Sequence, residues 1–192
     1  MRFDRSYYDR YYRDASTQVA SAADTAKLAR FVTGYLDYLG VEVRSILDVG
    51  AGIGLWQEPL RRAYPEARYV GLELSPHVAE AHGWVHGSIT TYRGPAADLV
   101  ICQGVLQYVP DAQLPRAITR LAALSRGALY LEALTRKDWR DNVDQERTDG
   151  AVHLRTGAHY RRLLREAGLR ACGGGVFLGP RSRAVLFELE EG

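Results

Sequence analysis

Residues 46–55 of this chain are Ile46-Leu47-Asp48-Val49-Gly50-Ala51-Gly52-Ile53-Gly54-Leu55, an apolar run that passes into three glycines. Residues 43–49 form a short run that is uncharged at its centre, Ile46-Leu47, and partly β-branched, which makes it apolar enough to predict a buried parallel strand. The glycines predict a turn at which a ligand can approach the backbone, because no side chain stands in its way. A helix is expected to follow over residues 55–63. This stretch therefore predicts a ligand-binding corner at the end of a strand.

The spacing of the glycines distinguishes this turn from two common nucleotide-binding motifs. In the dinucleotide-binding pattern G-x-G-x-x-G the third glycine would stand at position 55, but Gly54 comes one residue earlier and Leu55 follows it. A phosphate loop would continue with Gly-Lys and then Ser or Thr, and this turn does not. Neither a dinucleotide nor a triphosphate is therefore the predicted ligand.

The run from Asp48 to Gly54 resembles the nucleotide-loop motif of class I S-adenosylmethionine-dependent methyltransferases. Nineteen residues after Gly54, Glu73 ends a second strand-like run over residues 67–73. A carboxylate at that place can accept hydrogen bonds from both ribose hydroxyls of a nucleoside. The alternative is an exposed charge at a strand end. The resemblance implies S-adenosylmethionine as the cofactor.

The order of the elements predicts an α/β fold. Strands alternate with helices, and the chain is expected to close with an antiparallel hairpin of residues 176–178 and 184–189. We expect a seven-stranded, mostly parallel, doubly wound sheet with a C-terminal antiparallel hairpin, which is the Rossmann-like methyltransferase fold. A helix is expected over residues 25–39 with Asp24 as its N-cap. Residues 1–40 are predicted to form an N-terminal helical lid and packing helix, and residues 41–192 the methyltransferase domain, in a single globular unit.

Composition excludes several classes of protein. The chain has 192 residues, enough for one domain with a large core, and a formal net charge of +2 with mixed signs. Nucleic acid is therefore unsupported as a partner, and no apolar stretch is long enough to predict a membrane span or signal peptide. Two cysteines without CxxC spacing suit a reducing compartment, so a cytoplasmic location is expected. The oligomeric state is open.

The resemblance implies a set of cofactor-binding residues at the ends of the first four strands: Asp48, Gly50, Ala51, Gly52, Gly54, Glu73, Leu74, Ser88, Ile89 and Gln103. Ser88 stands where many family members carry an Asp that binds the adenine amino group. Either its hydroxyl or a nearby backbone group must then contact the adenine. Gln103 follows the apolar run 98–102 and is implied to border the methionine part of the cofactor. Asp98, which starts that run, is expected to be structural.

Two further segments are candidates for contact with the acceptor. The tyrosine-rich segment 3–12 resembles the lid of many small methyltransferases, with Tyr8, Tyr11 and Tyr12 as candidate contacts, and the alternative is an ordinary amphipathic helix. The polar segment 135–155, which includes Trp139, has no clean periodicity and is expected to line the acceptor pocket. Its acidic residues and His153 match no metal-site spacing, so no metal is predicted.

The implied reaction is an in-line displacement in which positioning does most of the work. A base is needed only for hydroxyl or protonated amine acceptors, and His153 is the first candidate, with His159 and Tyr108 behind it. The alternative for His153 is a surface residue.

We expect a small-molecule acceptor with an oxygen or nitrogen nucleophile, because the chain lacks a basic stripe and an added recognition domain. It also lacks the Asn/Asp-Pro-Pro-Tyr/Phe tetrapeptide of base-amino methyltransferases, since Gln103-Gly104-Val105-Leu106 stands at that place. The alternatives are a methyltransferase acting on a protein or tRNA and a non-catalytic protein that binds S-adenosylmethionine.

Overall fold

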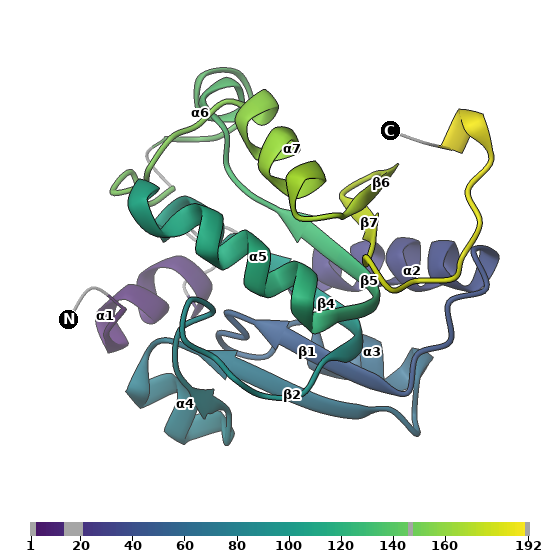
Figure 1. Ribbon diagram of the computed structural model, residues 1–192. Coiled ribbons are helices and arrows are strands. Elements are labelled where there is room, and N and C mark those ends of the chain that lie inside the picture. The colour runs from purple at the N-terminus through teal and green to yellow at the C-terminus, as the bar shows by residue number, and fades with distance from the viewer. Residues whose placement is uncertain (1–2, 14–20, 146–147, 191–192) are drawn as a thin grey trace.

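The computed structural model describes residues 3–13, 21–145 and 148–190, and its centre is a seven-stranded sheet in the order β3-β2-β1-β4-β5-β7-β6 (Figure 1). Strands β1 to β5 are parallel to one another, whereas β7 is antiparallel to both β5 and β6. The predicted fold class is confirmed. The strands are β1 Ser45–Val49, β2 Arg68–Glu73, β3 Val85–His86, β4 Ala97–Gln103, β5 Ser125–Glu132, β6 Arg170–Gly173 and β7 Val176–Leu178.

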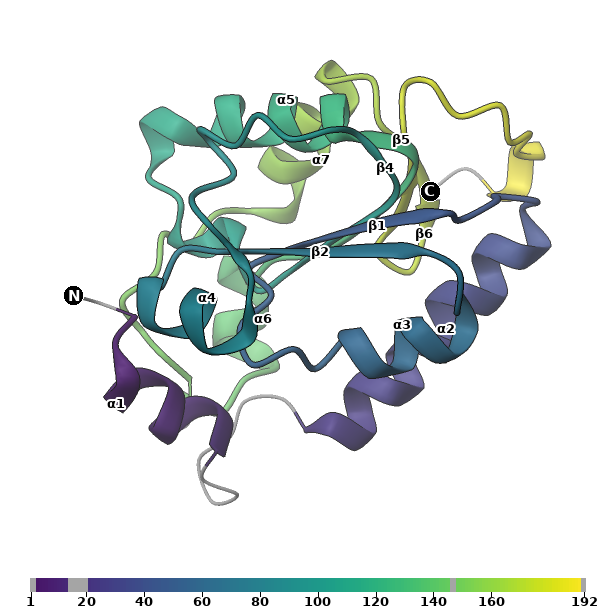
Figure 2. The same cartoon turned by 90° about the horizontal axis from the view of Figure 1, so that it is seen from below.

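Helices cover both faces of the sheet, as Figure 2 shows, with α5 and α7 on one side and α2 and α3 on the other. The helices are α1 Arg5–Tyr8, α2 Ala22–Tyr38, α3 Gln57–Ala63, α4 Pro76–His82, α5 Leu114–Leu124, α6 Arg136–Asp141 and α7 Gly157–Glu166. A π-helix, Asp9–Arg13, continues α1, and short 3-10 helices cover Leu106–Tyr108, Asp111–Gln113 and Glu188–Glu190. In the described part of the chain, no helix is both long and apolar enough to cross a membrane.

The central strand β4 divides its side chains between two hydrophobic cores. Val100 and Cys102 pack in the core under α5 and α7, whereas Leu99 and Ile101 pack in the core under α2 and α3. Successive side chains of a strand point to opposite faces, so a strand covered on both faces is apolar throughout. This double burial explains why residues 98–102 lack the alternation of a strand with one exposed face.

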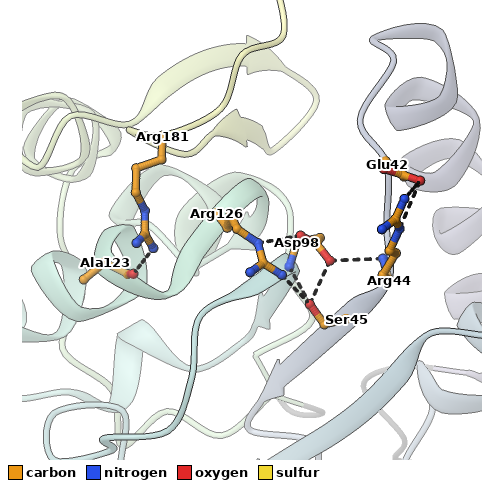
Figure 3. A network of polar contacts seen from close by, with 7 residues as sticks. All are labelled: Glu42, Arg44, Ser45, Asp98, Ala123, Arg126 and Arg181. Atoms are coloured by element: carbon orange, nitrogen blue, oxygen red, sulfur yellow. Dashed lines mark hydrogen bonds and ion pairs between the residues drawn. The ribbon is translucent and has the colours of Figure 1, made fainter.

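A polar network ties the sheet together at the ends of β1 and β4 that lie away from the glycine turn (Figure 3). Asp98 accepts hydrogen bonds from the Arg44 backbone N–H at 3.1 Å, the Ser45 hydroxyl at 2.8 Å and the Arg126 Nε at 2.7 Å. These contacts join the starts of three strands. Asp98 therefore has the structural position that was expected of it.

The start of α2 differs from the prediction. Ser21, not Asp24, is the N-cap, and its Oγ accepts the Asp24 backbone N–H at 3.1 Å. Asp24 lies in the first helical turn, where its Oδ2 accepts the Ser21 hydroxyl at 2.7 Å. The prediction of Asp24 was wrong because a second capping residue stands three positions earlier, the spacing at which the two side chains cooperate.

The closing hairpin also differs in its strands. It consists of β6 and β7, joined through Gly174 and Gly175, and residues 184–189 form no strand. Val185 and Phe187, which suggested a buried strand, are 74% and 72% exposed. The partner strand β6 escaped prediction because its four residues, Arg-Ala-Cys-Gly, form no apolar run and only Cys172 is buried.

The segment after β5 is more ordered than its sequence suggests. Thr135 caps α6, with its Oγ1 accepting the Asp138 N–H while the Asp138 carboxylate accepts the Thr135 N–H. Thr135 also forms a parallel bridge with Arg155, and the Arg136 N–H donates to the Arg155 carbonyl at 2.8 Å. Residues 136–154 thus leave and rejoin the structure at one point.

Candidate functional site

A cleft at the carboxyl ends of the strands consists of two adjoining cavities of about 340 and 440 Å³. We call the smaller one, beside the end of β2, the β2 cavity, and the larger one, beside the end of β5, the β5 cavity. Figure 2 shows α1, α4 and α6 at this end of the sheet. The two cavities share part of their walls: Tyr7, Gly50, Gln103, Gly104 and Tyr108.

The glycine turn forms the floor where the cavities meet. The N–H groups of Gly50 and Ala51 both donate to the Leu72 carbonyl, at 2.7 and 3.1 Å, which pins the turn to β2. Gly50 has φ +73°, and a Cβ placed on it would lie 2.4 Å from Val105 Cγ2. Only glycine fits this position, because the backbone is left-handed and the space above it is taken. Ala51 and Gly52 also line the β5 cavity, whereas Gly54 faces the Trp84 ring.

Glu73 is buried at the end of β2, so the alternative of an exposed strand-end charge is wrong. Its Oε2 accepts the Gly52 N–H at 2.9 Å, and its Oε1 accepts the Ser75 N–H at 2.8 Å and the Tyr8 hydroxyl at 3.0 Å. Glu73 lines the β2 cavity beside Leu74, Ser88 and Ile89. The Ser88 Oγ contacts the Thr90 hydroxyl at 3.0 Å. The structure thus brings these four predicted residues together.

Asp48 lies under the β5 cavity at the end of β1. It is almost fully buried, and burial raises the pKa of its carboxyl to about 7. The Tyr69 hydroxyl donates to Asp48 Oδ2 at 2.5 Å, and this hydrogen bond opposes the rise. The carboxyl can therefore change its protonation state near neutral pH.

Gln103 sits at the end of β4 and is held from both sides. Its Oε1 accepts the Trp56 indole N–H at 2.8 Å, and its Nε2 donates to Glu132 Oε2 at 3.2 Å. The Tyr130 hydroxyl donates to the same carboxylate oxygen at 3.0 Å. Glu132 thus lies on the wall of the β5 cavity in an orientation set by two neutral donors. The sequence analysis missed it, although an acidic residue at the end of an apolar strand was the available signal.

The N-terminal segment covers the cleft. Tyr8 lines the β2 cavity, Tyr11 lines the β5 cavity, and Tyr7 lines both, with its hydroxyl 2.9 Å from that of Tyr108. The side chain of Tyr12 lies outside the described residues. Trp139, on α6, does not line either cavity and lies against Gly150.

The three candidates for a base, Tyr108, His153 and His159, occupy different environments. Tyr108 lines both cavities from the 3-10 helix after β4. His153 is exposed and lines neither cavity, and its backbone N–H donates to the Gln107 carbonyl at 2.8 Å. His159, on α7, lines neither cavity either, so of the three side chains the structure brings only Tyr108 to the cleft.

Arg155 is a buried charged residue that sequence analysis did not identify. Its guanidinium donates to the carbonyls of Leu106 and Val109, to the Tyr160 hydroxyl and to the Asp111 carboxylate. These bonds hold the 3-10 helix that carries Gln107 and Tyr108. Arg155 thus positions one wall of the cleft from outside it.

Comparison with known proteins gives consistent matches. A family profile described as "Methyltransferase domain" matches residues 9–172. The ubiquinone biosynthesis O-methyltransferase of Methylobacterium nodulans is 31% identical over 116 residues, which are 53% of this chain and 45% of that protein. The chain therefore spans about half the length of this curated relative.

Solved structures share the fold at low sequence identity. DesVI of Streptomyces venezuelae superposes with a TM-score of 0.64 at 18% identity, covering 90% of this chain and 95% of that one. Magnesium protoporphyrin IX methyltransferase from Synechocystis with bound SAH superposes with a TM-score of 0.65 at 19% identity. The match covers 93% of this chain and 96% of that one. The sugar N-methyltransferase KedS8 from Streptoalloteichus superposes with a TM-score of 0.63 at 21% identity. The match covers 92% of this chain and 93% of that one.

Proposed function

The chain belongs to the methyltransferase domain family, with the class I S-adenosylmethionine-dependent fold, and from this premise we propose that it methylates a small molecule at an oxygen or nitrogen atom. The cofactor is S-adenosylmethionine. When bound, it supplies a methyl group on a positively charged sulfur that leaves as a neutral thioether. The contributions of this chain's own residues are binding, orientation and exclusion of water.

The β2 cavity suits the nucleoside part of the cofactor. Its buried Glu73 carboxylate only accepts hydrogen bonds, which matches the donors of two ribose hydroxyls. Gly50 lines this cavity and has no side chain, so a ligand there would meet its backbone directly. Leu74, Ser88 and Ile89 are then the candidates for contact with the adenine.

The β5 cavity suits the acceptor together with the methionine part of the cofactor, since residues implied to bind the cofactor line it, among them Asp48, Ala51, Gly52 and Gln103. The observation that carries the proposal is that the two cavities share one wall, so a donor and an acceptor held in them would meet beside Gly50 and Gln103. Alignment of two reactants can lower the barrier by roughly 7–11 kcal/mol without acid or base chemistry. Where a hydroxyl must lose its proton, Tyr108 is the nearer candidate, because His153 is exposed outside the cleft.

Calorimetry with S-adenosylhomocysteine tests the cofactor site. Glu73→Ala should weaken binding at least tenfold, because charge-assisted hydrogen bonds are worth roughly 1.5–3 kcal/mol each. The affinity of Glu73→Gln for S-adenosylhomocysteine should lie between that of Glu73→Ala and that of wild type. Glu66→Ala, which removes an exposed acid, is the control. A 2′,3′-dideoxy analogue should bind wild type and Glu73→Ala about equally. Equal weakening of both ligands would show that Glu73 does not anchor the ribose.

Transfer assays separate the alternatives. Methylation of a protein or tRNA with salt-sensitive binding, and no transfer to small molecules, would favour a macromolecular acceptor. Tight cofactor binding without transfer to any acceptor would favour a non-catalytic protein.

The free thiols of Cys102 and Cys172 are both buried, which supports a reducing compartment and hence a cytoplasmic location.

A further inference from the structure

The β5 cavity is acidic although the chain as a whole is slightly basic. Among the described residues, 3–13, 21–145 and 148–190, no Lys, Arg or His lines this cavity. Its wall carries four acidic side chains, namely Asp48, whose carboxyl has a pKa raised by burial to about 7, and Glu132, Asp138 and Asp149. The sequence contains 25 basic and 23 acidic residues, so this local excess does not follow from composition. An excess of one charge in a cleft favours ligands of the opposite charge.

These acidic side chains differ in the hydrogen-bond partners that they already have within the protein. Asp138 is engaged by Thr135 and Asn142 at the start of α6. Asp48 is deeply buried and holds the Tyr69 hydroxyl. Among the described residues, Glu132 accepts two hydrogen bonds, both on Oε2 and both from neutral groups, the Gln103 amide and the Tyr130 hydroxyl. Its negative charge is thus oriented but not neutralised by these contacts.

Gln107 provides a second, independent indication of a ligand. It is only 8% exposed and lines the β5 cavity, yet its buried Oε1 has no hydrogen-bond partner within the described part of the chain. A buried acceptor without a donor costs free energy, which a ligand carrying an N–H or O–H group would recover. The neighbouring backbone is fixed, because the Gln107 carbonyl accepts the His153 N–H and the Leu106 carbonyl accepts Arg155.

Aromatic rings complete the wall. Tyr7, Tyr11, Trp56 and Tyr108 all line the β5 cavity. Aromatic faces attract cations through the ring quadrupole, and they exclude water from the groups beside them. Carboxylate, amide oxygen and aromatic rings together form a set of groups that suits an ammonium ion better than a neutral or anionic group.

We propose that the acceptor is an amine, bound as its protonated form between Glu132 and the Gln107 amide oxygen, and that nitrogen is the methylated atom. This inference rests on the proposed function and narrows its acceptor class. The ammonium first gives up a proton to solvent or to a carboxylate of the wall. The free amine then forms the N–C bond with its lone pair while the methyl–sulfur bond breaks and its electrons stay on sulfur.

The test compares acceptors that differ only in charge and hydrogen-bonding capacity. Two trios serve, namely benzylamine, benzyl alcohol and benzoate, and glucosamine, glucose and glucuronate. Each is titrated by calorimetry into protein saturated with S-adenosylhomocysteine, so that binding is read without turnover, and each is assayed for methyl transfer. In each trio the amine should bind at least tenfold tighter than the alcohol, and the carboxylate should bind most weakly.

Two variants assign the contacts. Glu132→Gln keeps the shape of the side chain and removes its charge. It should weaken binding of the amine at least tenfold and have little effect on binding of the alcohol. Gln107→Leu removes the amide oxygen and should weaken both the amine and the alcohol. Glu166→Gln, at an exposed acid on α7, is the matched control, and it should leave the affinity for S-adenosylhomocysteine unchanged. Because Glu132 also accepts a hydrogen bond from Gln103, Glu132→Gln should lower the affinity for the amine more than the affinity for S-adenosylhomocysteine.

The outcomes separate the inference from the function it rests on. Tighter binding or faster methylation of an alcohol or carboxylate than of its amine partner would overturn the amine inference and leave methyl transfer to small molecules standing. Equal weakening of amine and alcohol by Glu132→Gln would also overturn it. If S-adenosylhomocysteine binds but no member of either trio is bound or methylated, the small-molecule function fails and the inference fails with it.

Discussion

The Tyr8 hydroxyl donates a 3.0 Å hydrogen bond to Oε1 of Glu73, which joins the N-terminal helix α1 to the end of β2 across 65 residues of sequence. Oε1 also accepts the Ser75 N–H, and Oε2 accepts the Gly52 N–H. A carboxylate offers about four lone-pair sites, so one remains on Oε2. Two ribose hydroxyls therefore cannot both bind Glu73 while Tyr8 stays in place.

Tyr8→Phe should tighten the binding of S-adenosylhomocysteine. The variant keeps the ring but removes the competing donor, and a net hydrogen bond of about 0.5–1.5 kcal/mol corresponds to a roughly two- to tenfold lower dissociation constant. The free protein should unfold at a slightly lower temperature, because it loses the same bond. Calorimetry and thermal unfolding measure the two effects. Weaker binding by Tyr8→Phe would show that Tyr8 supports the bound state instead of competing with it.

Gly50→Ala should weaken S-adenosylhomocysteine binding and lower the melting temperature. The added Cβ would lie 2.4 Å from Val105 Cγ2, and the left-handed backbone costs a further 1–2 kcal/mol or so for a residue with a side chain. Gly34→Ala is the control, since nothing lies within 4 Å of its Cβ in the middle of α2. That change should stabilise the protein by roughly 0.5–1 kcal/mol. Normal ligand affinity in Gly50→Ala would contradict the placement of the turn against the ligand.

Asp48→Asn should change how stability depends on pH. Burial raises the pKa of folded Asp48 to about 7 from 3.8, so between these values the folded protein holds a proton that the unfolded chain releases. The stability from this group is complete below pH 3.8 and is lost as pH rises through about 7. The unfolding free energy of wild type minus that of Asp48→Asn should therefore fall with pH, by at most about 1.4 kcal/mol per unit.

Urea unfolding followed by tryptophan fluorescence, over about pH 4 to pH 8, measures this difference. Other titrating groups are present in both proteins and largely cancel. A difference that stays constant, or that rises with pH, would mean that Asp48 is ionised in the folded protein across this range.

Arg155→Met should destabilise the protein and weaken acceptor binding more than cofactor binding. The substitution keeps an apolar stem but leaves the buried carbonyls of Leu106 and Val109 without their charged donor, which should cost at least about 2 kcal/mol. The control is Asp111→Asn, because Asp111 is 81% exposed and its ion pair with Arg155 is open to solvent. The control should lose less stability.

The positioning role of Arg155 has a separate readout. The acceptor KM should rise in Arg155→Met, because Gln107 and Tyr108 lie on the 3-10 helix that Arg155 holds, while the affinity for S-adenosylhomocysteine should change little. A loss of stability with an unchanged acceptor KM would reduce Arg155 to a purely structural residue.

The sequence predicted the half of the site that depends on local pattern. A glycine turn after a buried strand and an acid at the next strand end are constraints on backbone and spacing, so the turn at Gly50 and the position of Glu73 could be predicted from their neighbours in the chain. The confirmed α/β fold follows from the same alternation of strands and helices.

The other half depends on contacts that span long distances in the sequence. Arg155 donates hydrogen bonds to two carbonyls that lie 46 and 49 residues away in the sequence, and these contacts compensate its burial. No pattern in the neighbouring residues predicts this burial. Likewise, Glu132 becomes part of the cleft only through Gln103, which comes from a different strand. The hairpin partner of β7 was missed because residues 184–189 have the apolar pattern of a strand, whereas the true partner, β6, is only four residues long and has no apolar run.

The bridge between Thr135 and Arg155 allows one wall of the proposed acceptor cavity to be exchanged as a unit. Residues 136–154 enter and leave through one backbone pairing, and they contribute Asp138 and Asn142 to the β5 cavity. No described residue of this segment lines the β2 cavity. A segment of different sequence grafted between positions 135 and 155 can therefore alter which acceptor is bound without changing the β2 cavity. Acceptor specificity can then diverge in evolution while the residues that bind the cofactor stay the same.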